Sequence, residues 1–278
     1  MRRATGRIAA VLAVAGILAG IATAIWARFV APFRLSVNQV VVQLPRRHAH
    51  LDGVTIAFVT DTHIGPHFPV SALEPVLREL EQAQPDIVLF GGDYISESPR
   101  FLKDAAPALG RIGKTGRLGC WAILGNHDMA NTRNRVIPAL DEAGIPVLVN
   151  SAVRIDTGKG DLWVVGLDDG LLGEANLDAA YAGVPADAAS ICLWHEPDRI
   201  EESAPYGSFL QLSGHTHGGQ VRLPVVGPLA TPNLGQDHVL GRFQAGDMEL
   251  YVSAGIGMYR PPVRLGCPPE LTIVRLVG

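Results

Sequence analysis

The chain has 278 residues, enough for one large domain or two small ones, and no internal repeat is visible. The first 28 residues hold four of the 23 basic residues and no acidic one, so the remainder carries 19 basic and 27 acidic residues, a formal charge of −8. An acidic domain repels a polyanion, which argues against nucleic acid as a partner, and three cysteines provide no disulfide framework.

The N-terminal segment is predicted to cross a membrane. Residues 8–27 form a run of twenty residues without a charge, which as a helix would be about 30 Å long and match the hydrocarbon core of a bilayer. Three arginines precede this run, and Trp26 near its end suits a membrane interface. We therefore expect residues 1–30 to be a single-pass anchor in the inner (cytoplasmic) membrane, with the catalytic domain on the extracytoplasmic side.

The sequence leaves two other roles open for this segment. Ala22-Thr23-Ala24 has the small-residue pattern of a signal-peptide cleavage site, so the segment could instead be removed after export. Arg2-Arg3 could belong to a twin-arginine export signal, although it lies very close to the start of the chain. Residues 31–49 are predicted to be a linker, and residues 50–278 to form one domain.

Continuous apolar runs predict the strands, because such runs suit strands that are buried on both faces. In the first part of the domain these runs cover residues 54–60, 87–90, 120–124, 162–166, 191–194 and 209–213. In the last third the expected strands are 220–222, 241–245, 249–253 and 271–276, with few helices between them. An α/β half followed by a β-rich half fits two packed sheets with helices outside.

Two helices are predicted between the strands. Ser71 is expected to cap a helix that ends before Pro85 and carries one apolar stripe, made of Leu73, Val76, Leu77 and Leu80. A second helix is expected over residues 132–143, where Gly144 ends it.

Five short clusters place metal-binding side chains directly after predicted strands. They are Asp61-Thr62-His63, Gly91-Gly92-Asp93, Gly125-Asn126-His127-Asp128, His195 and Gly214-His215-Thr216-His217. The donors are carboxylates, imidazoles and a carboxamide, with no cysteine among them. This mixture of oxygen and nitrogen atoms is typical of a site for Mn, Fe or Zn, and not of a structural zinc site made of thiolates. These donors are too many for one tetrahedral ion, but they suit two ions that share a bridging carboxylate.

The position of these clusters indicates that they form one site. Ligands of open α/β sheets bind beyond the carboxyl ends of the strands, which is where all five clusters lie. Asp61 and His63 are two residues apart, so an extended backbone would present both on one face, and His215 and His217 repeat this spacing.

The order and spacing of the clusters resemble those of the calcineurin-like metallophosphoesterases, whose blocks are D-x-H, G-D, G-N-H-D/E, a lone H and G-H-x-H. The resemblance covers roughly residues 50 to 278. Residues 213–224 and 264–270 look like the membrane-anchored bacterial branch of this family, which includes phosphodiesterases and UDP-2,3-diacylglucosamine hydrolases. The resemblance implies an α/β fold, namely a four-layer αββα sandwich of two mixed β-sheets, preceded here by one transmembrane helix.

The resemblance also implies a role for each matching residue. One metal would be held by Asp61, His63 and His217, and a second by Asn126, His195 and His215, with Asp93 as the bridge. His127 would stabilise the transition state or protonate the leaving group, and Asp128 would orient the imidazole of His127.

The implied reaction is hydrolysis of a phosphodiester or pyrophosphate bond by in-line attack of a metal-bridging hydroxide. A small-molecule or lipid-linked substrate such as UDP-2,3-diacylglucosamine fits the predicted anchor. Two alternatives are a non-catalytic metal-binding scaffold on the same fold and a nuclease, which the acidic charge of the domain disfavours. The oligomeric state does not follow from the sequence.

Some polar residues match none of the five blocks. His48, His50 and His238 are expected at the surface, and Asp168-Asp169 in a capped turn. Cys120 and Cys192, in apolar runs, are expected to be buried thiols.

One apolar stretch near the last cluster is also conspicuous. Residues 223–234 carry no charge and are rich in proline and glycine, so neither a regular helix nor a long strand is expected. The stretch could pack onto its own domain, or Val225, Val226 and Leu229 could form an apolar lip beside the metals.

Overall fold

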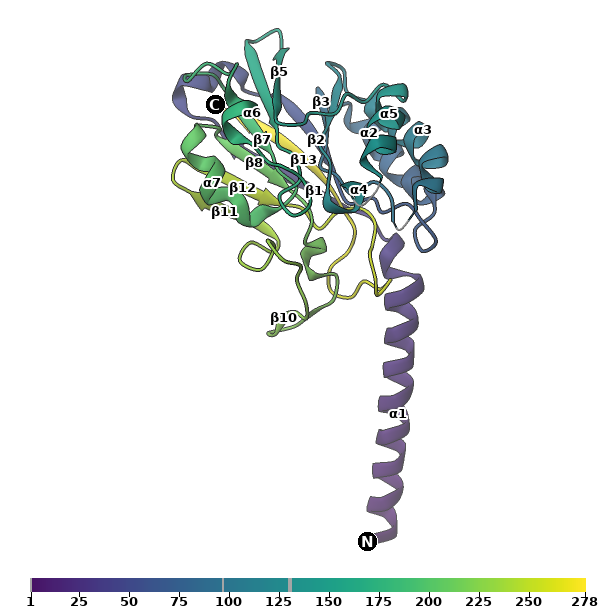
Figure 1. Cartoon of the computed structure of the whole chain (residues 1–278). Helices are drawn as coiled ribbons and strands as arrows, with labels where there is room; N and C mark the ends of the chain where they lie inside the picture. The colour runs from purple at the N-terminus through teal and green to yellow at the C-terminus, as the bar shows by residue number, and fades with distance from the viewer. Residues whose placement is uncertain (1, 97, 130–131) are drawn as a thin grey trace.

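The computed structural model describes residues 2–96, 98–129 and 132–278, in which two large β-sheets pack face to face (Figure 1). Within these residues, the strand order of the first sheet is β1 (Ser36–Gln43), β13 (Glu270–Val277), β2 (Thr55–Val59), β3 (Ile87–Phe90) and β4 (Cys120–Ala122). The strand order of the second sheet is β11 (Gly241–Ala245), β12 (Met248–Val252), β8 (Leu210–Ser213), β7 (Ser190–Leu193), β6 (Asp161–Gly166) and β5 (Ser151–Asp156). Both sheets are mixed, because β13 is antiparallel to β2 and β5 to β6 while most other neighbours are parallel.

Helices cover the outer face of each sheet. The helices on the first sheet are α2 (Glu74–Ala83), α3 (Leu102–Gly113) and α5 (Arg133–Glu142), and those on the second are α6 (Leu177–Tyr181) and α7 (Ile200–Ser203). Strand β2 shows how the layers are filled: Ile56 and Phe58 belong to the core between the sheets, whereas Ala57 and Val59 pack toward the helices. The predicted four-layer αββα sandwich is therefore confirmed.

The predicted strands coincide with observed ones to within two residues at each end. In the two large sheets, the sequence missed β1 and β5, which both lie at sheet edges and expose many of their side chains. Residues 31–49, treated above as a linker, thus contain an edge strand, β1, that pairs in parallel with β13. His48 is also buried, with its ring 6.3 Å from that of Phe209, so its expected surface position was wrong.

The two predicted helices are present, with one correction. A 3-10 turn (Val70–Leu73) precedes α2, so Ser71 does not cap this helix, and Leu73 occupies the N-cap position without a side-chain hydrogen bond. The apolar stripe of α2 is buried as expected. Helix α5 begins directly after its N-cap residue Thr132 and ends at Glu142, which confirms the second helix.

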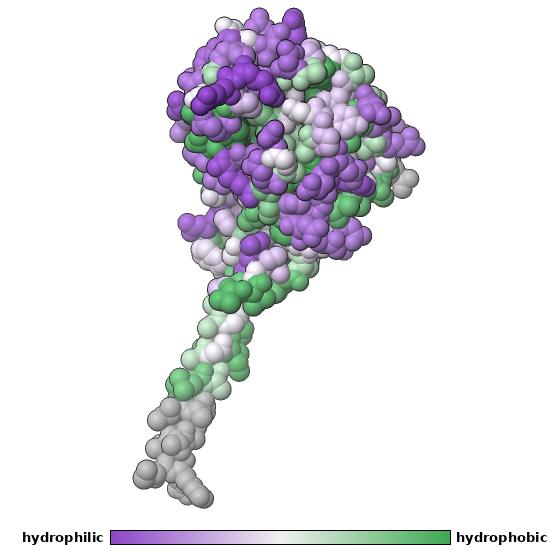
Figure 2. Space-filling model, turned by 90° about the vertical axis from the view of Figure 1, so that its left-hand side faces the viewer, coloured by the Kyte–Doolittle hydropathy of each residue, from purple (hydrophilic) through white to green (hydrophobic). Residues whose placement is uncertain are grey.

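Helix α1 (Arg2–Phe29) projects from the domain (Figures 1 and 2). By length and composition, the span Ala10–Phe33 is apolar enough to cross a membrane, and its most apolar 18-residue window is only 6% buried. The C-terminal end of α1 is fixed to the domain, because Ala27 is buried and its carbonyl oxygen accepts a 2.9 Å hydrogen bond from the backbone N–H of Arg264.

The apolar stretch after the last cluster forms a short hairpin, β9 (Arg222–Leu223) and β10 (Gly227–Pro228), followed by an irregular loop. The side chains of Val225, Val226 and Leu229 are exposed, so the tip of this hairpin does not pack onto its own domain.

Candidate metal centre

All five sequence clusters lie at the carboxyl ends of strands. Asp61 follows β2, Asp93 follows β3 and Asn126 comes shortly after β4, all in the first sheet. His195 follows β7 and His215 follows β8 in the second sheet. Because both sheets contribute, the centre lies at the junction of the two sheets, at one end of the sandwich.

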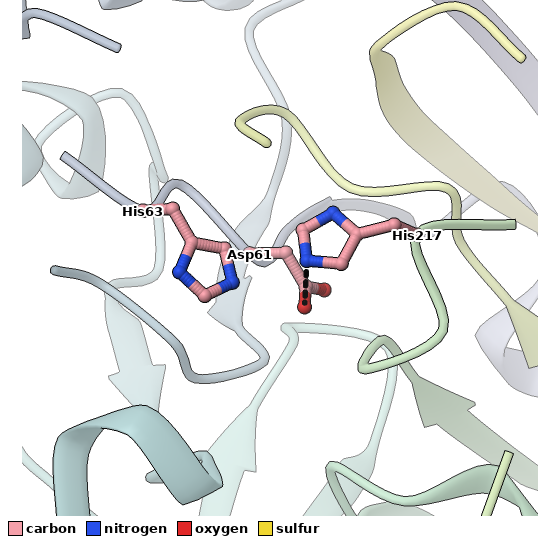
Figure 3. Close-up of side chains that lie close together, drawn as sticks. All are labelled: Asp61, His63 and His217. Atoms are coloured by element: carbon pink, nitrogen blue, oxygen red, sulfur yellow. Dashed lines mark ion pairs between the residues drawn. The ribbon is translucent and has the colours of Figure 1, made fainter. Parts of the chain in front are cut away.

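Short contacts join the side chains that were predicted as ligands. Asp93 lies between two imidazoles, with its Oδ2 atom 3.4 Å from His63 Nε2 and 3.2 Å from His195 Nε2. His217 Nε2 lies 3.5 Å from Asp61 Oδ1 (Figure 3), and His215 Nδ1 lies 3.0 Å from Asn126 Oδ1. The fold therefore brings all seven side chains together, with Asp93 in the place expected of a shared carboxylate, and their metal binding stays a prediction.

Among the described residues, several buried nitrogen atoms in this centre make no hydrogen bond. They are both ring nitrogens of His63 and the Nε2 atom of His195; the two Nε2 atoms only face the Asp93 carboxylate, at 3.4 and 3.2 Å, and both side chains are fully buried. An unsatisfied buried polar group costs roughly 1–3 kcal/mol, so several of them grouped around carboxylates call for a ligand. The donor set of imidazole, carboxylate and carboxamide fits divalent cations.

Backbone carbonyls orient two of the imidazoles. His195 Nδ1 lies 2.7 Å from the Gly91 carbonyl oxygen, and His215 Nε2 lies 2.8 Å from that of Asn233. A carbonyl only accepts, so each of these nitrogens carries the proton and the opposite nitrogen of each ring is left free to bind a metal. Burial lowers the pKa of His215 and His217, which favours the neutral imidazole that coordination requires.

The backbone at the predicted ligands is not extended, so the expectation that alternation along a strand places them was wrong. The φ angles are positive at Asp61 (54°), His63 (42°), Asp93 (56°), His215 (69°) and His217 (50°). Left-handed conformations of non-glycine residues cost roughly 1–3 kcal/mol each and gather at functional sites. The loops therefore adopt unfavourable backbone conformations, and these conformations direct the predicted ligands toward one another.

Gly214 provides a test of this close packing. A Cβ atom at this position would overlap Asp61 Oδ2 and Thr60 Oγ1. We expect Gly214→Ala to displace the Asp61 carboxylate and lower turnover by about 10²-fold, as misplacement of about 1 Å can do. Gly183→Ala is the matched control, since its added Cβ would meet nothing within 4 Å. Equal turnover and equal metal content in the two variants would contradict this account.

His127 lies on the one-turn helix α4 (Asn126–Met129) at the wall of a pocket of about 390 Å³. Its ring centroid is 4.3 Å from that of Tyr259 and 4.9 Å from that of His63. Burial lowers the pKa of His127, an effect that outweighs the opposing influence of Asp93. The half-buried imidazole therefore borders both the metal cluster and the space available to a substrate.

Asp128 does not orient the His127 imidazole, contrary to the expectation from the sequence. Among the described residues, its carboxylate accepts hydrogen bonds from backbone N–H groups: Asp93 (2.7 Å), Tyr94 (3.0 Å) and Gly125 (3.1 Å). Burial and the neighbouring Asp93 raise the pKa of Asp128 to about 7. This side chain thus holds the loops after β3 and β4 together, and acts on the site through Asp93.

The sequence did not single out two residues that the structure places beside the centre. Tyr259 borders the pocket and contacts the rings of His127 and His63. Arg264 is completely buried, and its guanidinium donates to the carbonyl oxygens of Ala254 (2.8 Å) and Gly257 (2.6 Å) and lies 3.4 Å from His217 Nδ1. Only the motif of residues 264–270 hinted at Arg264.

The remaining polar residues and cysteines that match none of the five clusters lie outside the metal centre. The Asp169 carboxylate accepts from the backbone N–H groups of Leu171 and Leu172, which confirms the capped turn. His50 is exposed, whereas His238 is half-buried and bonded to Asp198. Cys120 and Cys192 are buried free thiols, as predicted, and Cys267 is buried as well.

Comparisons with known proteins agree with this geometry. Residues 54–219 match the family model described as calcineurin-like phosphoesterase. The uncharacterized metallophosphoesterase YkuE of Bacillus subtilis (strain 168) is 31% identical over 255 residues, covering 90% of this chain and 88% of YkuE. The phosphodiesterase YaeI of Escherichia coli (strain K12) is 32% identical over 237 residues, with 80% and 82% covered. The UDP-2,3-diacylglucosamine pyrophosphatase LpxG of Chlamydia trachomatis serovar D is 27% identical over 320 residues, with 92% and 94% covered.

Proposed function

The chain belongs to the calcineurin-like phosphoesterases and is a phosphoester hydrolase, and from this premise we propose that it cleaves a phosphodiester or pyrophosphate bond of a lipid-linked substrate at a membrane surface. The observation that carries the proposal is the group of buried imidazole nitrogens of His63 and His195 beside Asp93, which make no hydrogen bond within the described part of the chain. Such a group suits two divalent cations and has no evident role in folding.

The proposed ligand set uses all seven side chains. One cation would be held by Asp61, His63 and His217, the other by Asn126, His195 and His215, and both by Asp93. Two divalent cations bound there would supply a nucleophilic hydroxide near neutral pH and stabilise the charge that develops on the phosphoryl oxygens. The chain's own contribution is to hold the donors in place and to exclude bulk water, because the predicted ligands of the described loops are almost all buried.

His127 has a separate role in this proposal. Its imidazole faces the pocket, so it can donate a hydrogen bond or a proton to the leaving oxygen of a bound ester. Asp128 would act by positioning the loop that carries Asp93, whose backbone N–H it accepts. The donor set suits Mn, Fe or Zn.

Three observations support a membrane-bound substrate. Helix α1 can span a bilayer, and the resulting anchor would lie in the inner membrane with the domain on the extracytoplasmic side. The pocket beside His127 is bordered by apolar side chains such as Leu229 and Pro232. The similar protein LpxG is named for a diacylated nucleotide-sugar substrate.

The test is hydrolysis by the full chain in detergent or nanodiscs after loading with Mn²⁺, Fe²⁺ or Zn²⁺. We expect about two metal ions per chain and turnover of bis-(p-nitrophenyl) phosphate and of UDP-2,3-diacylglucosamine. Bound metal without turnover of any ester would instead indicate a non-catalytic scaffold. Faster cleavage of DNA or RNA than of small diesters would indicate a nuclease.

A further inference from the structure

The hairpin β9–β10 ends in an apolar tip that is exposed to solvent. Val225 is fully exposed, Val226 is 68% exposed, and Leu229, just beyond the hairpin, is 57% exposed. The surrounding stretch, residues 223–234, carries no charge. Three large apolar side chains gathered on a projecting segment form the kind of patch that marks an interaction surface.

The backbone conformation at the tip of the hairpin does not stabilise the fold. Val225 has a φ angle of 69°, although a β-branched residue is rarely left-handed. A turn that only reversed the chain would be more stable with glycine or asparagine at this position. Exposure and strain thus fall on the same residue, which points to a contact with something outside the domain.

The base of the hairpin is built onto the metal centre. A Cβ atom on Gly219, two residues after His217, would overlap the Pro228 Cβ atom, so the hairpin rests directly on this motif. Leu229 N–H donates a 3.0 Å hydrogen bond to the Val221 carbonyl oxygen, and both residues line the pocket. An apolar wall therefore runs from the tip toward the predicted ligands.

The hairpin and helix α1 are tied to the same short segment. Arg264 N–H donates to the Ala27 carbonyl at the end of α1 (2.9 Å), and the next residue, Leu265, accepts from Arg222 N–H at the base of the hairpin (2.8 Å). Figure 1 shows the β10 end of the hairpin and α1 projecting from the same side of the domain, and Figure 2 shows apolar surface where the helix joins it. The tip therefore lies on the side that faces the membrane which α1 can cross.

We propose that the tip of the β9–β10 hairpin inserts into the bilayer that α1 spans, so that the pocket opens at the membrane surface. A lipid phosphoester can then present its head group to the metal centre while its acyl chains stay in or near the bilayer. The inference of insertion is drawn from the exposed tip and its link to α1. The inference that the tip delivers substrate rests in addition on the proposed function. The occupant that surrounds the tip is the hydrocarbon core of the lipid bilayer, just below its head groups.

Insertion can be measured without any enzymatic activity. The three native cysteines are buried, so Val225→Cys adds an accessible thiol for a fluorescent label on the full chain. In phosphatidylcholine nanodiscs with spin-labelled acyl chains, we expect strong quenching at position 225. Leu118→Cys is the control, because Leu118 is 37% exposed and precedes β4 at the end opposite the metal centre. Equal quenching at the two positions would overturn the insertion, and so would a label at 225 that neither lipid nor aqueous iodide quenches, since protein would then cover it.

The second arm tests delivery of the substrate. Val225→Asp with Val226→Asp should raise the KM for a lipid phosphoester in vesicles about tenfold or more, and leave turnover of bis-(p-nitrophenyl) phosphate unchanged. Leu118→Asp should change neither. Equal losses on both substrates would refute a role of the tip in delivery. Quenching at position 225 in a chain that hydrolyses no lipid would keep the insertion and reject the proposed substrate.

Discussion

Asp93→Asn is expected to lower turnover by several orders of magnitude and to deplete the second metal ion. Asp93 is the carboxylate that lies within 3.4 Å of both His63 and His195, and its Oδ1 atom also accepts the backbone N–H of His127 (2.8 Å). Removal of its charge therefore weakens both halves of the centre at once. Loss of a single-metal ligand, as in His63→Ala, should cost less. Metal content and kcat are the measurements.

The matched control for Asp93 is Asp86, at the other end of the same strand. Asp86 precedes β3 and bonds the Thr55 backbone N–H (2.8 Å) at the end away from the centre, whereas Asp93 follows the strand. Asp86→Asn should keep both metals and near-normal turnover. A doubly loaded Asp93→Asn protein with near-normal kcat would remove Asp93 from its bridging role.

His127→Ala is expected to lower kcat by about 10²–10⁴-fold while the metal content stays unchanged. The imidazole borders the pocket and the metal cluster, where it can assist departure of the leaving oxygen. If it donates a proton there, the loss should be smaller for a p-nitrophenyl ester than for an alkyl ester, because p-nitrophenolate leaves without protonation.

The control for His127 is His50→Ala, which removes an exposed imidazole and should have no effect. The structure also supplies a rival outcome, since His63, Asp93 and His127 by themselves form a group that could hold a metal. Loss of one metal ion in His127→Ala would make His127 a ligand and reject its assignment as a proton donor.

The sequence by itself determined the layers and the members of the centre. Strands such as β2 and β3 are buried on both faces, so their apolar runs are continuous and local, and the polar residue that ends each run marks the edge of the sheet. Asp61 and Asp93 could therefore be placed at one end of the sandwich before any contact was known.

Only the tertiary structure decided what depends on segments far apart in the chain. Strand β1 exposes much of its length and is fixed by pairing with β13, more than 200 residues later, so its local signal is weak. Two of the backbone amides that bond Asp128, those of Asp93 and Tyr94, belong to another loop, and no side-chain motif encodes them. The same holds for the link from α1 through residues 264 and 265 to the hairpin, because hydrogen bonds between distant backbone groups leave no mark in the sequence.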